Sequence, residues 1–193
     1  KEFTVAFDLD KDKVIVFRAR ENDFKAFSIK KNQKREYVFG PNFAHILGYV
    51  SRVDEEGGAG IEKYYNEELK ETAGIIETEK DVYGNVIKEE MKRVPESGKN
   101  VVLNIDMDLQ EKAAEIMAPV LKDSGAKSGT VIVMDPNSGA ILTMLTLPSY
   151  DNNAFSKNLT EEEYQKMLND QSISFFNRAL AGEYAIGSTV KPF

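Results

Sequence analysis

Ser188 and Lys191 are the residues best suited by type and spacing to carry chemistry, in the run Tyr184-Ala-Ile-Gly-Ser-Thr-Val-Lys-Pro-Phe193. A helix places positions i and i+3 on one face, so a hydroxyl and an amine at this spacing can meet. Lysine is one of the few side chains that can serve as the base for a serine nucleophile. The pair therefore predicts Ser188 as a nucleophile and Lys191 as its general base.

The neighbours of Ser188 separate this pair from two others with the same spacing, Ser28 with Lys31 and Ser124 with Lys127. A capping serine beside a surface lysine produces the same pattern without any chemistry. Gly187 would allow a sharp turn that leaves the Ser188 hydroxyl uncovered, and Pro192 favours a place in the first turn of a helix. We therefore expect backbone N–H groups to stabilise an oxyanion near Gly187 and Thr189.

Composition excludes several classes of protein. The 193 residues suffice for one large domain or two small ones, and 41% hydrophobic residues suffice for a packed core. A net charge of −7 argues against nucleic-acid binding, which needs a concentrated basic surface. The absence of cysteine excludes disulfides and thiolate metal sites. No apolar run reaches the length of a membrane span, and we expect no signal peptide in this stretch.

Two regions are expected, 1–97 and 98–193, because the run Pro95-Glu-Ser-Gly98 is typical of a boundary. In the first region, apolar residues alternate over 3–9 and continue over 14–17, which predicts a β-hairpin. Helical spacing of apolar residues predicts a short helix over 61–69. A second hairpin is expected over 75–94, with its turn at 83–85.

The second region is expected to combine helices with one more hairpin. The pattern predicts a strand at 101–105 and then a helix that Asp106 caps and Pro119 kinks or ends. Strands are expected over 130–134 and 140–146, around a turn at 135–139. Thr160 and Glu163 form a capping box for a helix through about Leu168. The fold class is therefore α+β, with antiparallel hairpins.

Several separated segments resemble class B penicillin-binding proteins. The runs Phe43-Ala-His-Ile-Leu-Gly-Tyr49 and Gly58-Ala-Gly-Ile-Glu-Lys-Tyr-Tyr-Asn66 are similar to the non-catalytic, antiparallel-strand pedestal domain of that family. Residues 101–106 and 131–142 resemble the entry and first hairpin of its transpeptidase domain, which is serine β-lactamase-like. Phe176-Asn-Arg-Ala179 and Gly187-Ser-Thr-Val-Lys-Pro192 resemble the approach to its active serine. Residues 150–179 look most like the elongation-type enzymes.

The resemblance implies a concrete reaction. Ser188 would be acylated by the D-Ala-D-Ala end of a peptidoglycan stem peptide, with neutral Lys191 taking the hydroxyl proton. An amine from a neighbouring strand would then resolve the acyl-enzyme into a cross-link. β-Lactam antibiotics would acylate the same serine, and the reaction would need no metal or organic cofactor. The family also implies the outer face of the cell membrane, an N-terminal anchor outside this chain, and a membrane glycan polymerase among its cell-wall partners.

Two departures from the family pattern bear on activity. Ile186 stands where the family usually has proline before the glycine of the motif, which would loosen the turn but leaves the nucleophile in place. The family's S-x-N and K-T-G motifs are expected downstream of Phe193, and these supply the proton relay, an oxyanion-hole donor and a substrate groove. We therefore expect the 193-residue polypeptide to be a fragment that is inactive by itself.

The alternative to an enzyme is an interaction module, a pedestal that docks other cell-wall synthesis proteins while its serine is inert. A β-lactam-sensing receptor or a serine β-lactamase would also carry the motif, but the long region before it argues against both. His45, the only histidine, is expected to be packed rather than catalytic. Glu161, Glu162 and Glu163 are expected in the first turn of a helix. Asp151 and Asn152 would shape a loop near the site or cap the next turn.

Overall fold

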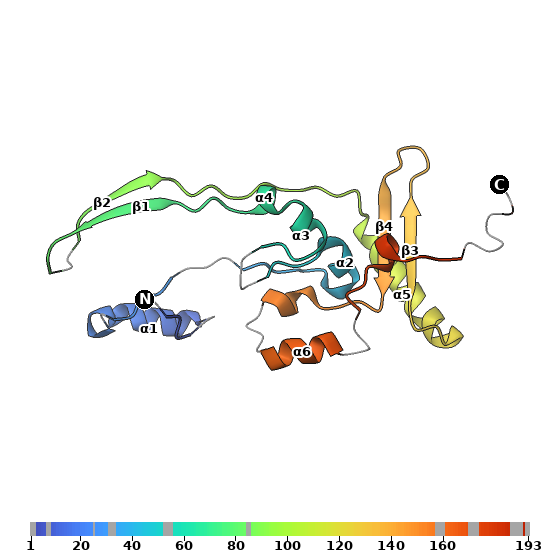
Figure 1. Cartoon of the computed structure of the whole chain (residues 1–193), viewed down its shortest axis with the longest axis horizontal. Coiled ribbons are helices and arrows are strands. Elements are labelled where there is room, and N and C mark those ends of the chain that lie inside the picture. Colours follow the sequence, from blue (N-terminus) through green and yellow to red (C-terminus); the bar gives the residue numbers. More distant parts are fainter. Residues whose placement is uncertain are drawn as a thin grey trace. The chain divides into compact units, whose positions relative to one another are not determined.

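The computed structural model describes residues 3–6, 9–24, 26–30, 34–51, 56–83, 86–156, 161–169, 174–185 and 191 (Figure 1). The chain divides into two compact units, Lys1–Glu36 and Tyr37–Phe193. The larger unit contains both hairpins and the helices that flank them. The functional boundary expected at residues 97 and 98 lies within this larger unit and stays a prediction.

The first unit is helical, and the hairpin predicted for 3–17 is wrong. Helix α1 spans Lys11–Ala19 and is followed by the 3-10 helix η1, Glu21–Phe24. The charged residues 11–13 instead form the first helical turn, where the helix dipole stabilises the carboxylate of Asp12. Lys13 pairs with Asp10, the residue before the helix, at 3.3 Å. Phe17 stacks on Phe24 with ring centroids 5.8 Å apart. Strand propensity depends on a partner strand, and this segment has none among the described residues.

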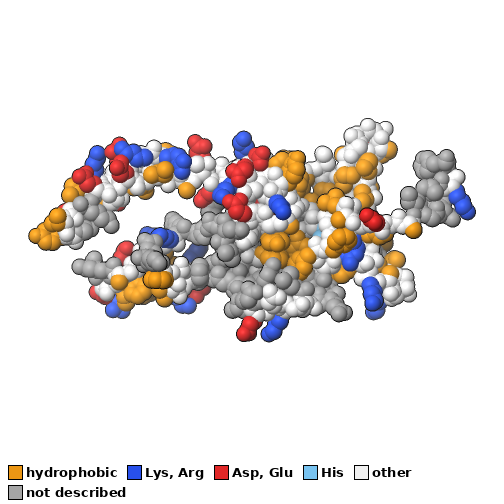
Figure 2. Space-filling model, viewed as in Figure 1, with side chains coloured by type: hydrophobic (Ala, Val, Ile, Leu, Met, Phe, Trp, Pro, Cys, Tyr) orange, Lys and Arg blue, Asp and Glu red, His pale blue; other side chains and the backbone are white. Residues whose placement is uncertain are grey.

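The predicted second hairpin is confirmed as strands β1, Ile75–Lys80, and β2, Val86–Arg93, which pair antiparallel. Every described side chain of the two strands is exposed. One face is charged, because Lys92 pairs with Glu77 at 3.2 Å and with Glu90 at 3.0 Å. Figure 2 shows basic and acidic side chains interspersed over these strands. The opposite face carries the cross-strand pair Ile76 and Met91, each 57% exposed.

Short helices precede this hairpin. They are η2, Gly40–Phe43, and α2, Ala44–Leu47, followed by α3, Gly60–Tyr64, and α4, Asn66–Leu69. The predicted helix over 61–69 is therefore confirmed, with an interruption at Tyr65. Gly48 ends α2 with a φ of 76°, and a Cβ at this position would collide with the backbone carbonyl of Ala59. Only glycine fits this close approach of two backbone segments.

The longest helix, α5, spans Met107–Ser124, and its predicted cap is confirmed because Asp106 Oδ1 accepts a hydrogen bond from Leu109 N at 2.9 Å. Pro119 lies inside the helix and does not end it. The strand predicted at 101–105 is wrong. This segment is not part of any described ladder, and Asp106 N donates to the Leu142 carbonyl at 2.8 Å instead.

Strands β3, Gly129–Met134, and β4, Ile141–Leu147, form the predicted third hairpin, with Val131 opposite Leu145. The Asp135 side chain shapes the turn, because its Oδ1 accepts from Asn137 N at 3.0 Å and its Oδ2 from Ser138 Oγ at 2.5 Å. Helix α5 packs on both strands. Leu145 is completely buried, whereas Ile132 on β3 is 49% exposed.

The remaining elements are η3, Asn152–Ser156, α6, Glu161–Asn169, and α7, Arg178–Ala181. Helix α6 begins at Glu161, which confirms the acidic first turn, while Thr160 of the predicted capping box lies outside the described residues. A small aromatic core joins η3 to α2 through Ala44, Tyr150 and Phe155. The α+β class with antiparallel hairpins is therefore confirmed.

Candidate active site and its scaffold

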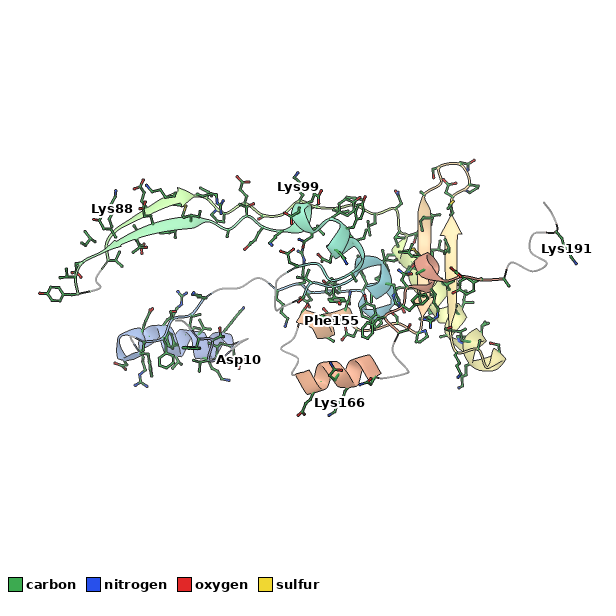
Figure 3. All side chains as sticks on the ribbon, in the orientation of Figure 1. Asp10, Lys88, Lys99, Phe155, Lys166 and Lys191 are labelled. Carbon is green, nitrogen blue, oxygen red and sulfur yellow. The ribbon has the colours of Figure 1, made fainter. Side chains whose placement is uncertain are left out.

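The predicted nucleophile, Ser188, lies outside the described residues, as do Gly187 and Thr189, predicted near the oxyanion, and Ile186. Lys191 is described, and its side chain is exposed (Figure 3). A lysine acts as a base in its neutral form, which burial favours. The described residues do not supply that burial, so the roles of Ser188 and Lys191 stay predictions.

The structure gives a local role to Ser124, the serine of a competing pair. Ser124 Oγ, at the C-terminal end of α5, donates to the Val120 carbonyl at 2.7 Å and approaches the Leu121 carbonyl at 3.2 Å. Its partner in the motif, Lys127, is exposed in the loop that follows. The Ser124 hydroxyl therefore bonds to backbone carbonyls in the last turn of the helix, in agreement with the non-catalytic interpretation of this spacing.

The described segment that leads toward Ser188 is held by Asn177 and Arg178. Asn177 Oδ1 accepts from Ala179 N at 3.1 Å and from Leu180 N at 3.3 Å, so it caps α7. Arg178 Nη1 donates to Ser174 Oγ at 2.7 Å. Helix α7 packs on β3 and β4. The segment is thus anchored on the hairpin sheet before the chain reaches the predicted nucleophile.

A strap, defined as residues 37–48, contacts the second region through a series of backbone carbonyls. Side chains of that region donate to carbonyl oxygens along its length: Asn153 to Tyr37 (2.9 Å), Ser149 to Pro41 (2.6 Å), Gln110 to Asn42 (2.8 Å), Tyr150 to Ala44 (2.9 Å), Asn177 to His45 (3.0 Å) and Asn152 to Gly48 (3.1 Å). All of these bonds except that of Ser149 lie in buried or partly buried surroundings, where a carbonyl without a partner is costly, so they fix the position of the strap. The strap therefore connects the first region to the scaffold of the site.

His45 is buried in this strap, 7% exposed, as predicted for a packed histidine. Its ring contacts Tyr150 edge to face, with centroids 5.1 Å apart. Burial lowers the pKa of His45, backbone groups of Pro148 and Ser174 partly oppose this shift, and the charge of Arg178 adds to it. Among the described residues, Nε2 has no hydrogen-bond partner. Burial also raises the pKa of Tyr150, so its hydroxyl stays protonated and donates to the Ala44 carbonyl.

Sequence reasoning did not assign roles to Gln110 and Asn177, although both make several hydrogen bonds with the strap and its neighbours. Gln110 is a polar, uncharged residue at helical spacing from the apolar residues Met107, Ala114 and Met117, and this position on an apolar stripe was the signal that could have found it. Asp151 caps the following turn, because its Oδ1 accepts from Asn153 N at 3.0 Å. Asn152 is fully buried and contacts the strap, so the two residues of this loop differ in role.

Neither a metal centre nor a membrane span is found in the described part of the chain. No group of three or more His, Asp or Glu side chains there could hold a metal ion. No helix within the described ranges is long and apolar enough to cross a bilayer. Glu56 of the acidic run 54–56 pairs with Lys70 and Asn66, while the other two acids lie outside the described residues.

Two protein-family models match the chain. The penicillin-binding protein dimerisation domain matches residues 1–103, and the penicillin-binding protein transpeptidase domain matches residues 129–193. The second match contains β3, β4, α7 and both predicted catalytic residues. Together the two models cover most of the chain in the order expected from its sequence.

Curated proteins similar to the chain are named peptidoglycan D,D-transpeptidases. The chain is 33% identical over 206 residues to MrdA of Haemophilus influenzae, an alignment that covers 96% of this chain and 31% of the relative. It is 29% identical over 209 residues to MrdA of Escherichia coli K12, covering 98% and 32%. The chain therefore spans about a third of the length of these relatives.

Several solved structures have a similar fold. One is Pseudomonas aeruginosa PBP2 in complex with WCK 5153, with a TM-score of 0.62 and 30% identity. The match covers 86% of this chain and 34% of that chain. A chain from a peptidoglycan synthase complex that coordinates polymerization and crosslinking has a TM-score of 0.62 at 26% identity, covering 84% and 33%. A complex between PBP2 and MreC from Helicobacter pylori contains the same fold, with a TM-score of 0.68 at 24% identity, covering 90% and 34%.

Proposed function

Because the chain belongs to the penicillin-binding protein family, we propose that it is the pedestal and first catalytic part of a serine-type peptidoglycan D,D-transpeptidase. The observation that carries this proposal is the Ser188-x-x-Lys191 motif inside the segment that matches the transpeptidase domain. The scaffold of strap, α7 and β3–β4 hairpin supports it, since a catalytic group needs rigid support. The names of the similar curated proteins support the same reaction.

The reaction proceeds by two acyl transfers. Lys191 accepts the proton of the Ser188 hydroxyl while Ser188 Oγ bonds to the penultimate carbonyl carbon of a D-Ala-D-Ala peptide. The peptide bond to the last D-Ala breaks, and the departing amine takes up a proton. An amine of a second stem peptide then attacks the ester, which restores the Ser188 hydroxyl and forms the cross-link. A strained β-lactam amide reacts with the same hydroxyl in the first step.

Labelling with a fluorescent penicillin tests this function in the full-length protein. Ser188→Ala should abolish the covalent label, and Lys191→Ala should slow labelling by roughly a hundredfold or more because the base is lost. Ser124→Ala is the matched control, since Ser124 has the same spacing to a lysine yet bonds the end of α5. Equal labelling of wild type and Ser188→Ala would refute the proposed nucleophile.

A second function, docking of cell-wall partners, is supported by an exposed apolar pair on one face of the β1–β2 hairpin. Ile76 and Met91 face solvent together there, and an isolated two-stranded hairpin is only marginally stable in water. We propose a membrane glycan polymerase as the occupant of this face, in keeping with the similar chain from a peptidoglycan synthase complex. We propose that the protein is membrane-anchored on the outer face of the cell membrane, where it would meet such a partner.

Co-purification of the full-length protein with the polymerase tests the docking proposal. Replacing Ile76 and Met91 by lysine should abolish co-purification and leave penicillin labelling intact. Lys88→Glu, on the charged face of the same hairpin, should affect binding much less. If the double lysine variant bound the polymerase as well as wild type, the polymerase would have to bind another surface.

A further inference from the structure

Asn177 joins two parts of the scaffold through the two ends of one amide. Its Oδ1 accepts from the backbone N–H groups of Ala179 and Leu180, at 3.1 and 3.3 Å, and so caps α7. Its Nδ2 donates to the His45 carbonyl in α2 at 3.0 Å. An asparagine side chain can make both contacts at once because it has a separate acceptor and donor. The cap and the tether are therefore chemically distinct functions of one residue.

The His45 carbonyl is a fixed point to which the segment can be tied. The carbonyls of Asn42 and Ala44, on its N-terminal side, are bound by Gln110 and by the Tyr150 hydroxyl. The His45 ring itself is buried against Tyr150. Buried and bonded on several sides, this part of the strap has little freedom to shift.

Helix α7 needs such a tie, because a four-residue helix has little stability of its own. It lies beside β3 and β4 (Figure 1), and none of its residues is buried. It is also the last helix described before Ser188 in the sequence. The direction in which the chain leaves α7 thus depends on the contacts of Asn177 and of Arg178.

We propose that Asn177 is a positioning residue for acylation: its bond to the His45 carbonyl ties the chain that leads to Ser188 to the strap. This proposal rests on the proposed transpeptidase function for its effect on rate. The tether itself is a property of α2 and α7 that can be measured without any reaction. A change in the strap would reach the approach to the nucleophile through this amide.

Asn177→Asp separates the tether from the cap. Aspartate is as good an N-cap as asparagine, so the bonds from Ala179 and Leu180 can persist. An ionised carboxylate has no proton to donate, so the bond to the His45 carbonyl is lost at neutral pH. Protonation of the carboxyl restores one donor, so acidification should restore part of the tether. Asn177→Ala removes both contacts and serves as the reference for complete loss.

The experiment measures the second-order rate of labelling by a fluorescent penicillin in the full-length protein. At neutral pH we expect Asn177→Asp and Asn177→Ala to react about tenfold to a hundredfold more slowly than wild type, as expected for misplacement of a reacting group. The ratio of Asn177→Asp to wild type should rise as the pH is lowered, whereas the ratio for Asn177→Ala should not. Wild-type rates in Asn177→Asp at neutral pH would overturn the proposal and leave Asn177 as a helix cap only.

Hydrogen exchange on the same proteins provides a readout that does not depend on catalysis. Loss of the tether should increase exchange in peptides that cover α2 and residues 182–185 in Asn177→Asp, while the β1–β2 hairpin stays unchanged. Unchanged exchange in Asn177→Asp would refute the tether even if the rates fell. If wild-type protein never labels, the transpeptidase proposal fails, and hydrogen exchange still decides whether Asn177 ties α7 to the strap.

Discussion

The imidazole of His45 is the one side chain in the sequence whose ordinary pKa lies close to neutrality. It is also among the few ionisable groups that the fold buries. Burial and the charge of Arg178 both favour the neutral ring and lower its pKa from the ordinary value of 6.5. A charged ring here would face Tyr150 and Arg178 without a described hydrogen-bond partner for Nε2.

Acidification should therefore destabilise the fold through His45. Below the ordinary pKa of 6.5 the unfolded chain binds a proton that the folded chain does not, so the free energy of unfolding decreases as the pH falls. The slope should approach, and not exceed, about 1.4 kcal/mol per pH unit for one proton. Urea unfolding between about pH 7.5 and pH 5 measures it.

His45→Phe is the control for this pH dependence, because phenylalanine can keep an edge-to-face contact with Tyr150 but does not titrate. The variant should lose most of the dependence of stability on pH between about 7 and 5.5. If wild type and His45→Phe showed the same slope in this window, another group would be responsible.

At the scale of elements, α5, β4 and η2 meet at the Gln110 side chain, which is completely buried. Its Nε2 donates to the Asn42 carbonyl at 2.8 Å and to the Met144 carbonyl at 3.2 Å, and its Oε1 accepts from Met144 N at 2.9 Å. The amide therefore pairs with β4 as a neighbouring strand would, and at the same time holds the strap. The Gln110 side chain thus supplies hydrogen bonds to the backbone of β4 and of η2 that no neighbouring strand among the described residues supplies.

Gln110→Leu should be strongly destabilising even though the two side chains are similar in size. It leaves partly buried backbone groups of Asn42 and Met144 without these partners, which should lower the free energy of unfolding by about 2–4 kcal/mol. Thermal or urea unfolding measures the loss. Gln165→Leu, the same change at an exposed position of α6, should alter stability by less than about 0.5 kcal/mol. Similar effects of the two substitutions would contradict the role of Gln110.

At the scale of the whole molecule, β3 and β4 form a sheet of only two described strands, with helices α5 and α7 packed on it. Ile132 and Met134 on β3 are 49% and 54% exposed. A strand with one unpaired edge and exposed apolar side chains is a site for pairing with another chain.

The 193-residue polypeptide by itself should therefore associate as its concentration rises. Sedimentation velocity over a range of concentrations measures this association, and Ile132→Lys should suppress it by placing a charge on the edge strand. Ile87→Lys, the same change on the exposed β1–β2 hairpin, should have a smaller effect. Strong hydrogen-exchange protection of β3 and β4 that is independent of concentration would argue against an open edge.

Features that depend on nearby residues could be predicted from the sequence. The cap of α5 depends on Asp106 and the N–H of Leu109, and the turn at 135–139 depends on Asp135 and the residues just after it. The β1–β2 hairpin likewise follows from apolar and charged residues on either side of the run Tyr83-Gly-Asn85. The Ser188-x-x-Lys191 motif is also local, so the sequence alone was sufficient to propose its chemistry and its family.

Tertiary structure decided what depends on distant partners. Residues 14–17 have β-branched and aromatic side chains, yet they form part of a helix because no strand among the described residues is available to pair with them. Residues 101–105 likewise have no partner strand among the described residues and form no ladder. The donors that bind the strap come from residues far away in the sequence, such as Gln110 and Asn177. No local pattern marks a backbone carbonyl as a partner, because every residue has one.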